Sequence, residues 1–165
     1  MPEETDRSEP HRPTTAASYG IPTARAGLLD WEFVADAMRT DRQFWVGTVR
    51  PDGFPHLRPA WGVWLDGTFH CGGGSETRWV RNLDRDPRIV VHRDDAQSVV
   101  ILEGTAERLD VGSADPDRLA RIDAAYEAKY GIEHGTPVFA VHPERVLAWR
   151  DFPADATRWT VDPST

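Results

Sequence analysis

Hydrophobic and β-branched residues alternate with polar residues in several short runs, the pattern typical of β-strands with one buried face. Six such runs, each bounded by turn residues, cover 43–50, 55–65, 68–71, 89–92, 98–108 and 137–150, and a further short run covers 158–161. The turns at 51–54 and at Asp66-Gly67 join the first three runs, so these runs should pair antiparallel as a meander. Gly104, inside the fifth run, predicts a β-bulge.

Three other stretches repeat their apolar residues at the helical period. The first begins after Asp30, a residue suited to capping a helix, and the third begins at Asp115-Pro116 and ends at Gly131. The second covers 76–85, with Ser75 as its expected cap. The sequence therefore predicts helices inserted between strands.

Together these elements predict a mainly β fold with inserted helices: a six-stranded antiparallel sheet that closes into a barrel or pairs its edges. Residues 1–27 are rich in Pro, Thr, Glu and Ser and lack a hydrophobic period, so we expect a flexible N-terminal tail. The remaining residues, 28–165, are expected to form a single cofactor-binding domain, because the chain length suits one hydrophobic core.

The net charge of the chain argues against two classes of binding partner. The chain has 27 acidic and 19 basic residues, a formal net charge of −8, which argues against nucleic acid or an anionic membrane surface as a partner. No purely apolar run is longer than that at 99–102, which is too short to span a bilayer, and the acidic N-terminus does not resemble a signal peptide. Cys71 is the single cysteine, so no intrachain disulfide is expected, and a cytoplasmic location fits.

Motifs for side-chain catalysis are missing from the sequence. There is no nucleophile elbow, no Walker loop and no dinucleotide-binding fingerprint after a strand. The six histidines are scattered; His70 and His92 lie on expected strands but without a recognisable metal-ligand spacing. We therefore predict neither a catalytic side chain nor a metal site.

One part of the sequence suits a flat, anionic ligand instead. Within the second strand, Arg58 shares a face with Ala60 and Gly62, and a glycine inside a strand indicates close approach of another group to the backbone. After the third strand, 73–78 reads Gly-Gly-Ser-Glu-Thr-Arg at a helix start, where free amides, hydroxyls and a guanidinium can bind phosphate. Each feature alone is also explained by a simple loop or a solvated helix face.

Five short motifs extend this picture: Thr-Val-Arg-Pro-Asp-Gly-Phe-Pro-His at 48–56, Arg-Pro-Ala-Trp at 58–61, Thr-Arg-Trp-Val-Arg-Asn-Leu at 77–83, Asp-Pro-Arg-Ile at 86–89 and Glu-Gly-Thr-Ala-Glu at 103–107. In their order and spacing, from about Asp30 to Trp159, they resemble the pyridoxamine 5′-phosphate oxidase-like superfamily of flavin and deazaflavin oxidoreductases. The resemblance implies an FMN-binding split barrel, a homodimer with its cofactor at the subunit interface, and FMN or the deazaflavin coenzyme F-420 as that cofactor.

By position, the resemblance also assigns cofactor contacts. Arg58 would reach the cofactor phosphate, 59–62 would run beside the ring, and Thr77 with Arg78 would hold the phosphate. Asn82 and Ser98 match polar positions near the cofactor, while the Trp-Arg pairs at 149–150 and 158–159 resemble residues that approach the ring or substrate, often from the other subunit. The full predicted set is Arg58, Pro59, Ala60, Trp61, Gly62, Ser75, Thr77, Arg78, Trp79, Asn82, Ser98, Trp149, Arg150, Arg158 and Trp159.

One position departs from the family pattern. The family usually has a lysine directly after the arginine at 78, and here Trp79 replaces that charge with a large ring. The resemblance implies an oxidoreductase that transfers a hydride between the bound ring and a small organic substrate. The alternatives are a non-catalytic protein that binds or sequesters a flavin, haem or tetrapyrrole on the same barrel, and a structural dimer with an empty pocket.

Overall fold

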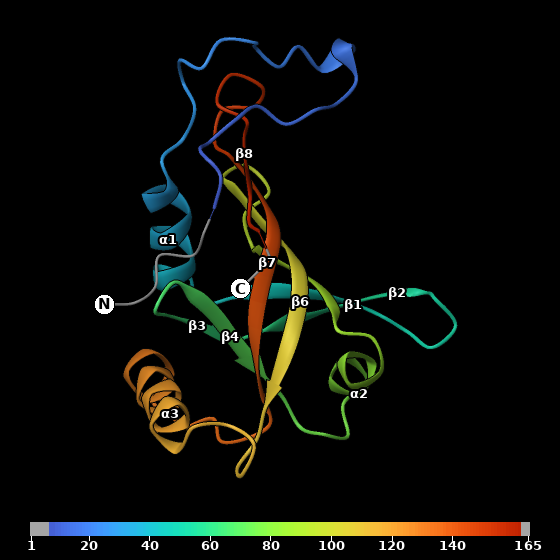
Figure 1. Cartoon of the computed structure of the whole chain (residues 1–165), viewed down its shortest axis with the longest axis vertical. Helices are drawn as coiled ribbons and strands as arrows, with labels where there is room; N and C mark the ends of the chain where they lie inside the picture. The colour runs from blue at the N-terminus through green and yellow to red at the C-terminus, as the bar shows by residue number, and fades with distance from the viewer. Residues whose placement is uncertain (1–6, 163–165) are drawn as a thin grey trace.

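The computed structural model describes residues 7–162, which form one curled antiparallel sheet flanked by helices (Figure 1). The strands are β1 (Phe44–Val49), β2 (Pro55–Ala60), β3 (Gly62–Leu65), β4 (Thr68–Gly72), β5 (Arg88–Arg93), β6 (Val99–Leu109), β7 (Val138–Trp149) and β8 (Thr157–Thr160). The α-helices are α1 (Trp31–Thr40), α2 (Arg78–Arg85) and α3 (Pro116–Tyr130). The predicted mainly β split barrel with inserted helices is confirmed, but with eight strands in place of six.

A single residue joins the two edges of the sheet. The strand order is β2-β1-β5-β6-β7-β4-β3, which places β2 and β3 at opposite edges, although only Trp61 separates them in the chain. The sheet must therefore curl until its edges meet at Trp61. The prediction of one strand over 55–65 was wrong, because Ala60 pairs with Phe44 on one edge whereas Gly62 pairs with Cys71 on the other. Two hairpins, β1–β2 and β3–β4, thus replace the expected meander.

The longest strand pair, β6–β7, contains the predicted bulge. The register shifts between Glu103 and Gly104, where Glu103 pairs with Arg145 and Gly104 pairs with Pro143. Around this point β7 changes its second neighbour, from β4 in its first half to β8 in its second half. A Cβ atom on Gly104 would lie 2.0 Å from the carbonyl oxygen of His142, so the two backbones approach closely enough to require glycine here.

We expect Gly104→Ala to lower the free energy of unfolding by about 2 kcal/mol, because the new methyl group forces two paired backbones apart. Gly74→Ala is the matched control, since a Cβ atom there meets nothing closer than 3.9 Å. Urea denaturation of both variants measures the difference. Equal unfolding midpoints for the two variants would contradict the close approach at Gly104.

Local signals explain where the helices begin and end. The Asp115 side chain accepts a hydrogen bond from the backbone N–H two residues further on, and α3 ends at Gly131 in the left-handed conformation (φ 78°). The predicted cap of the second helix was wrong. Helix α2 begins two residues later than expected, with Thr77 and not Ser75 at its N-cap position, and the Thr77 hydroxyl donates to the Gly74 carbonyl at 2.7 Å.

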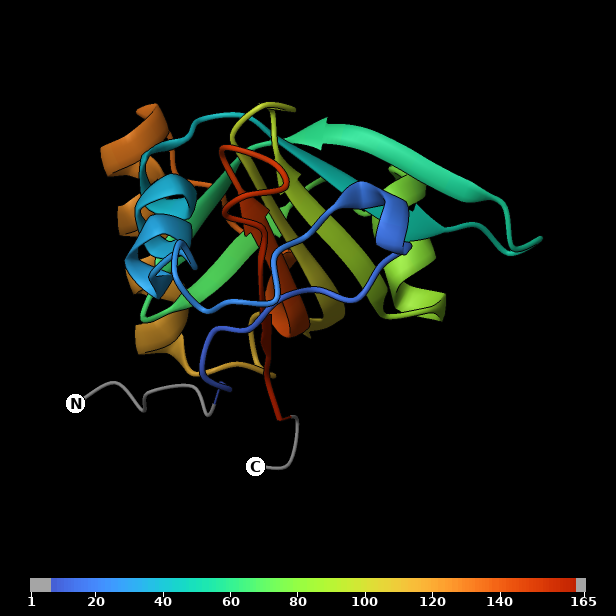
Figure 2. The same cartoon turned by 90° about the horizontal axis from the view of Figure 1, so that it is seen from above.

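Two hydrophobic clusters hold the fold together. The larger one fills the inside of the curled sheet, and the smaller one lies between α3 and the sheet around Tyr126 and Ile122. In both views α1 and α3 lie to one side of the central strands, and α2 lies to the other, against β1 and β2 (Figures 1 and 2). The strands β1 and β2 therefore have α2 packed on their inner face.

The segment before α1 runs along the free edge of β8. Arg7 and His11 form antiparallel bridges to Val161 and Arg158, and the Arg12 guanidinium donates to the Ala154 carbonyl at 2.8 Å. Figure 2 shows this part of the chain crossing in front of β7 and β8. Of the expected flexible tail, 1–27, residues 1–6 lie outside the described part of the chain and the rest has these contacts. The boundary between a tail and a domain at 27/28 stays a prediction.

Across residues 7–162, no helix combines the length and apolar character needed to cross a membrane.

Candidate functional site

Positively charged side chains gather in a hollow between the β1–β2 hairpin and the start of α2. The lining residues are Arg50, Pro51, Asp52, His56, Arg58 and Arg78, around a cavity of about 530 Å³. We call this hollow the basic pocket. Three separate elements supply its charges: Arg50 follows the last residue of β1, Arg58 lies within β2, and Arg78 is the first residue of α2. The fold therefore brings Arg58 and Arg78, both predicted to bind the cofactor phosphate, to the same pocket. Arg50 lines this pocket as well.

The three guanidinium groups of the basic pocket have no carboxylate partner among residues 7–162. Arg58 donates to the carbonyl oxygen of its neighbour Leu57, and Arg50 lies over the Phe54 ring at 5.4 Å. Other arginines do have carboxylate partners: Arg93, for example, pairs with the Asp41 carboxylate at 2.7 Å. Unpaired guanidiniums close together repel one another, so the basic pocket is suited to an anion with several acceptor oxygens.

A buried polar group lies below the three guanidiniums. His56 is only 3% exposed, and its pKa is lowered by burial and by the charges of Arg58, Arg50 and Arg78. Its strand partner Thr48 accepts a hydrogen bond from the Asn82 amide at 3.1 Å. The imidazole is therefore mostly neutral at pH 7. His56 is not among the site residues predicted from the sequence, although its face of β2 is the one that carries Arg58.

The segment 59–62 leads away from the basic pocket toward α3. Trp61 stacks on Tyr130 with ring centroids 4.6 Å apart and an angle of 2° between the rings. The backbone of Gly62 is held by Tyr130, whose hydroxyl accepts from its N–H at 3.0 Å, and by Lys129, whose amine donates to its carbonyl at 2.8 Å. Burial lowers the pKa of Lys129 to about 8. These two residues fix the point where the sheet edges meet.

The reason for a glycine at position 62 differs from the expected one. A Cβ atom there would lie 2.0 Å from the Phe69 ring, so the flat group that approaches this backbone is a core side chain of β4. The Phe69 ring therefore explains why position 62 is a glycine. A close approach of the ligand to Gly62 stays a prediction.

We expect Tyr130→Phe to lower the free energy of unfolding by about 1 kcal/mol, because the Gly62 amide loses its hydroxyl acceptor in a half-buried setting. Tyr19→Phe is the control, since the structure gives the Tyr19 hydroxyl no hydrogen bond within the described chain and leaves the residue 57% exposed. Chemical denaturation compares the two. A loss as large in Tyr19→Phe as in Tyr130→Phe would contradict this role for the Tyr130 hydroxyl.

Four of the other predicted residues lie near the basic pocket without lining it. Ser75 and Thr77 are exposed in the loop before α2, and the Thr77 hydroxyl is already bonded to Gly74. Trp79 is 8% exposed and its ring packs inside the barrel against Phe139. Asn82 is fully buried behind the pocket, where it bonds to Thr48, so it supports the wall and does not face a ligand.

The remaining predicted residues lie on other parts of the sheet. Ser98 accepts from Arg93 at 2.9 Å, beyond the opposite end of β1 from the basic pocket. Trp159 is buried in the core, whereas Arg150 is exposed and lies 3.7 Å from the Asp155 carboxylate. Within one copy of the chain, none of these three lines the basic pocket.

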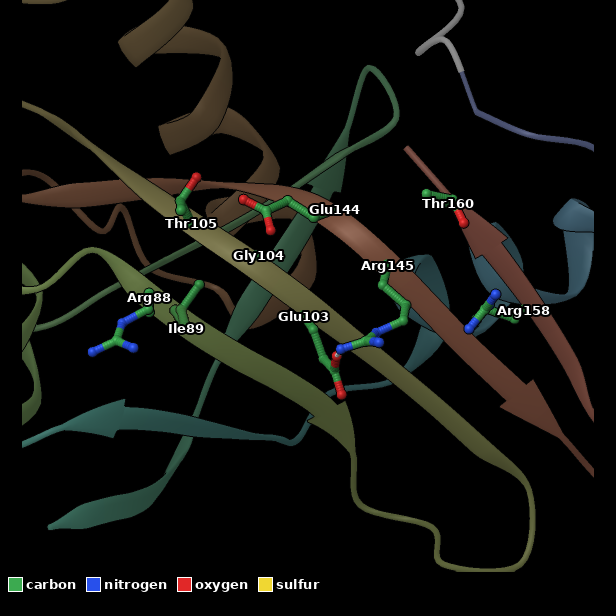
Figure 3. Close-up of a pocket in the computed structure, with 9 residues that line it drawn as sticks. All are labelled: Arg88, Ile89, Glu103, Gly104, Thr105, Glu144, Arg145, Arg158 and Thr160. Carbon is green, nitrogen blue, oxygen red and sulfur yellow. Dashed lines mark hydrogen bonds and ion pairs between the residues drawn. The ribbon is translucent and has the colours of Figure 1, made fainter. Parts of the chain in front are cut away.

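Trp149 and Arg158 border hollows on the outer face of the sheet. Figure 3 shows one of these, where Arg145 of β7 turns toward Glu103 of β6, with Arg158 of β8 beside them. The Arg145–Glu103 pair measures 2.6 Å, so much of the charge in this hollow is satisfied internally. A second hollow shares Arg158 and is walled by Trp149 and Phe152, whose rings meet edge to face at 5.4 Å. The outer face thus brings the C-terminal aromatic and basic residues together, away from the basic pocket.

A family model described as pyridoxamine 5′-phosphate oxidase matches residues 31–150, most of the chain. The chain belongs to the pyridoxamine 5′-phosphate oxidase family. The match begins at α1 and ends one residue after β7, so it includes the basic pocket but neither the N-terminal segment nor β8. No curated protein matches the chain.

Several solved structures share the fold at low sequence identity. A conserved hypothetical protein, Rv2991 of Mycobacterium tuberculosis, is 23% identical with a TM-score of 0.61, over 78% of this chain and 89% of that one. A haem-binding protein of Mycobacterium smegmatis is 19% identical with a TM-score of 0.62, over 81% of this chain and 60% of that one. An F-420 reductase is 17% identical with a TM-score of 0.51, over 67% of this chain and 94% of that one. At these identities the comparisons establish the fold.

Proposed function

We propose that the chain binds FMN or coenzyme F-420 with the phosphate group in the basic pocket, and that it is an oxidoreductase acting on a small organic substrate. The observation that carries this proposal is the gathering of Arg50, Arg58 and Arg78 without a carboxylate partner in the described chain. Phosphate is the group that such planar donors bind best. Membership of the pyridoxamine 5′-phosphate oxidase family and the shared fold of an F-420 reductase support the same choice.

The residues after Arg58 provide a path for the ring of such a cofactor. Trp61 lies three residues after Arg58, about 10 Å along an extended chain, which suits the length of the cofactor's phosphorylated side chain. When bound, the ring supplies the hydride transfer. The chain itself would hold the phosphate at the guanidiniums, offer backbone amides to the ring near 59–62, and present the Trp61–Tyr130 pair as a flat wall.

The proposal includes a homodimer formed through the outer face of the sheet. The outer face of the sheet carries a row of residues that are paired across β2, β1, β5 and β6, including Leu57 and Val90, which are 48% and 37% exposed. Exposed apolar side chains on a sheet face favour burial against another surface. A homodimer through this face would bury Leu57 and Val90 against the other copy, and the family resemblance implies that Trp149 and Arg158 of one copy then approach the cofactor of the other. Light scattering that finds only monomers would remove this part of the proposal.

Haem binding without turnover is the second candidate, and one histidine favours it. His92 lies on the same outer face, opposite Trp45 and Ile101 on the neighbouring strands. Its Nδ1 lies 2.9 Å from the carbonyl of Arg93, so with Nδ1 as donor the Nε2 atom keeps a free lone pair. An imidazole held in this way can ligate haem iron. A structural relative described as haem-binding adds to this candidate.

Titrating the purified protein separately with FMN, F-420 and haem, followed by absorption and fluorescence, distinguishes these candidates. A shifted flavin or deazaflavin spectrum with saturable binding supports the proposed cofactor, and re-oxidation of its reduced form by a substrate then supports the enzyme. A strong haem Soret band that His92→Ala removes, with no flavin binding, would support the haem-binding alternative.

A further inference from the structure

His56 is buried in the wall of the basic pocket. Its Nδ1 atom has no hydrogen-bond partner, and the neighbouring polar pair, Thr48 with Asn82, leaves the Asn82 carbonyl oxygen without one as well. A buried polar atom without a partner costs about 1–3 kcal/mol, so such atoms usually serve a purpose when they line a site. Because His56 lines the basic pocket, a ligand that enters this pocket is the candidate to supply the interaction that His56 lacks.

The charges that face His56 come from each element around it. Arg58 lies on the same strand, Arg50 lies at the end of β1, and Arg78 lies at the start of α2. Asp52 is the one acidic residue that lines the pocket, and its carboxylate accepts from the Phe54 amide at 3.0 Å. Positive charge therefore dominates around the imidazole, and this charge opposes its protonation.

We propose that His56 takes up a proton when a phosphate group enters the basic pocket and then acts as a fourth cationic group facing the anion. This inference rests on the proposed function, because it assigns a further binding residue to the same phosphate site. A doubly charged anion among the three guanidiniums cancels the field that keeps the imidazole neutral. The same anion attracts the new positive charge on the ring, so anion binding and proton uptake favour each other.

Two consequences follow from this coupling. Because each ligand strengthens the binding of the other, the anion should bind more tightly as the pH falls toward the range where His56 titrates. The four positive groups also suit a phosphate monoester, which can carry two negative charges, better than a phosphodiester, which carries one. The site would therefore favour a cofactor that ends in a monoester, as FMN does.

Sulfate is the probe for the test, because it stays doubly charged between pH 5 and 8.5 and so leaves any pH dependence to the protein. We expect the NMR titration midpoint of the His56 ring to rise by about one pH unit when sulfate saturates the site, and the sulfate Kd to fall up to about tenfold between pH 8 and pH 5.5. An unchanged His56 midpoint under saturating sulfate would overturn the proposal.

Variants separate His56 from the site as a whole. In His56→Gln the sulfate Kd should no longer depend on pH, whereas in His142→Gln, which alters an exposed histidine paired with Glu107, the wild-type dependence should remain. A pH dependence that survives in His56→Gln would assign the proton to another group and overturn the proposal. No sulfate binding by the wild type at any pH would overturn the phosphate site itself, and with it the proposed function.

Discussion

Replacing Arg58 or Arg78 with alanine should weaken cofactor binding about five- to 150-fold, which corresponds to about 1–3 kcal/mol for a charged hydrogen bond. Both guanidiniums line the basic pocket and neither is neutralised by a carboxylate in the described chain, so each is available to the phosphate. The double variant should lose less than the sum of the two single losses, since both side chains bind the same phosphate group. Fluorescence titration with FMN and with F-420 measures these constants.

Arg39→Ala is the matched control for the loss of one positive charge. Arg39 lies on α1, where it is half exposed and 3.5 Å from the carboxylates of Glu32 and Asp36. Its removal should change the cofactor Kd by less than twofold, about 0.4 kcal/mol. If the Arg58 and Arg78 variants bind the cofactor as tightly as Arg39→Ala does, the phosphate lies elsewhere.

Acidification should destabilise the protein through His70, by about 3 kcal/mol between pH 6.5 and pH 4. His70 is 2% exposed, both of its ring nitrogens lack hydrogen-bond partners, and burial is the main cause that lowers its pKa to about 4. The unfolded chain binds a proton at this residue below about pH 6.5, while the folded chain resists it until about pH 4. The unfolded state therefore holds more protons in this window, and stability falls as the pH falls.

His70→Leu tests this assignment, because leucine removes the titrating ring and leaves no polar atom unpaired. Urea denaturation at pH 4.5 and at pH 7 should show a smaller loss for the variant than for the wild type. His56 also has a lowered pKa and contributes to the same window, so His56→Gln serves as the comparison. If the wild type and His70→Leu lose equal free energy of unfolding on acidification, this result would contradict the role of His70.

Much of the fold could be predicted because local signals agreed with the final structure. The cap at Asp115, the stop at Gly131 and the bulge at Gly104 all lie where the sequence placed them. The break at Trp61 was not predicted, because Gly62 was interpreted as a place where a ligand approaches a continuous strand. The break arises only when the curled sheet brings its two edges together, which is a property of the whole barrel.

The candidate site also contains residues that could be predicted from the sequence and residues that only the fold brings together. Arg58 and Arg78 could be found because the resemblance assigns each of them to the cofactor phosphate. Arg50 and His56 lie in the motif at 48–56 without such an assignment, and they join the site through the β1–β2 pairing. The position of Trp79 needed the structure as well, since a tryptophan at a helix start can face a ligand or the core. Here it packs on Phe139 inside the barrel, so no side chain replaces the family's lysine charge at that point.

The most direct measurement compares FMN with riboflavin, which has the same ring and lacks the phosphate, in binding to the purified protein. If the basic pocket holds the phosphate group, FMN should bind at least about tenfold more tightly than riboflavin, and Arg58→Ala should reduce that ratio toward one. Equal affinities of the wild type for FMN and riboflavin, or an affinity ratio that Arg58→Ala leaves unchanged, would contradict phosphate binding in the basic pocket.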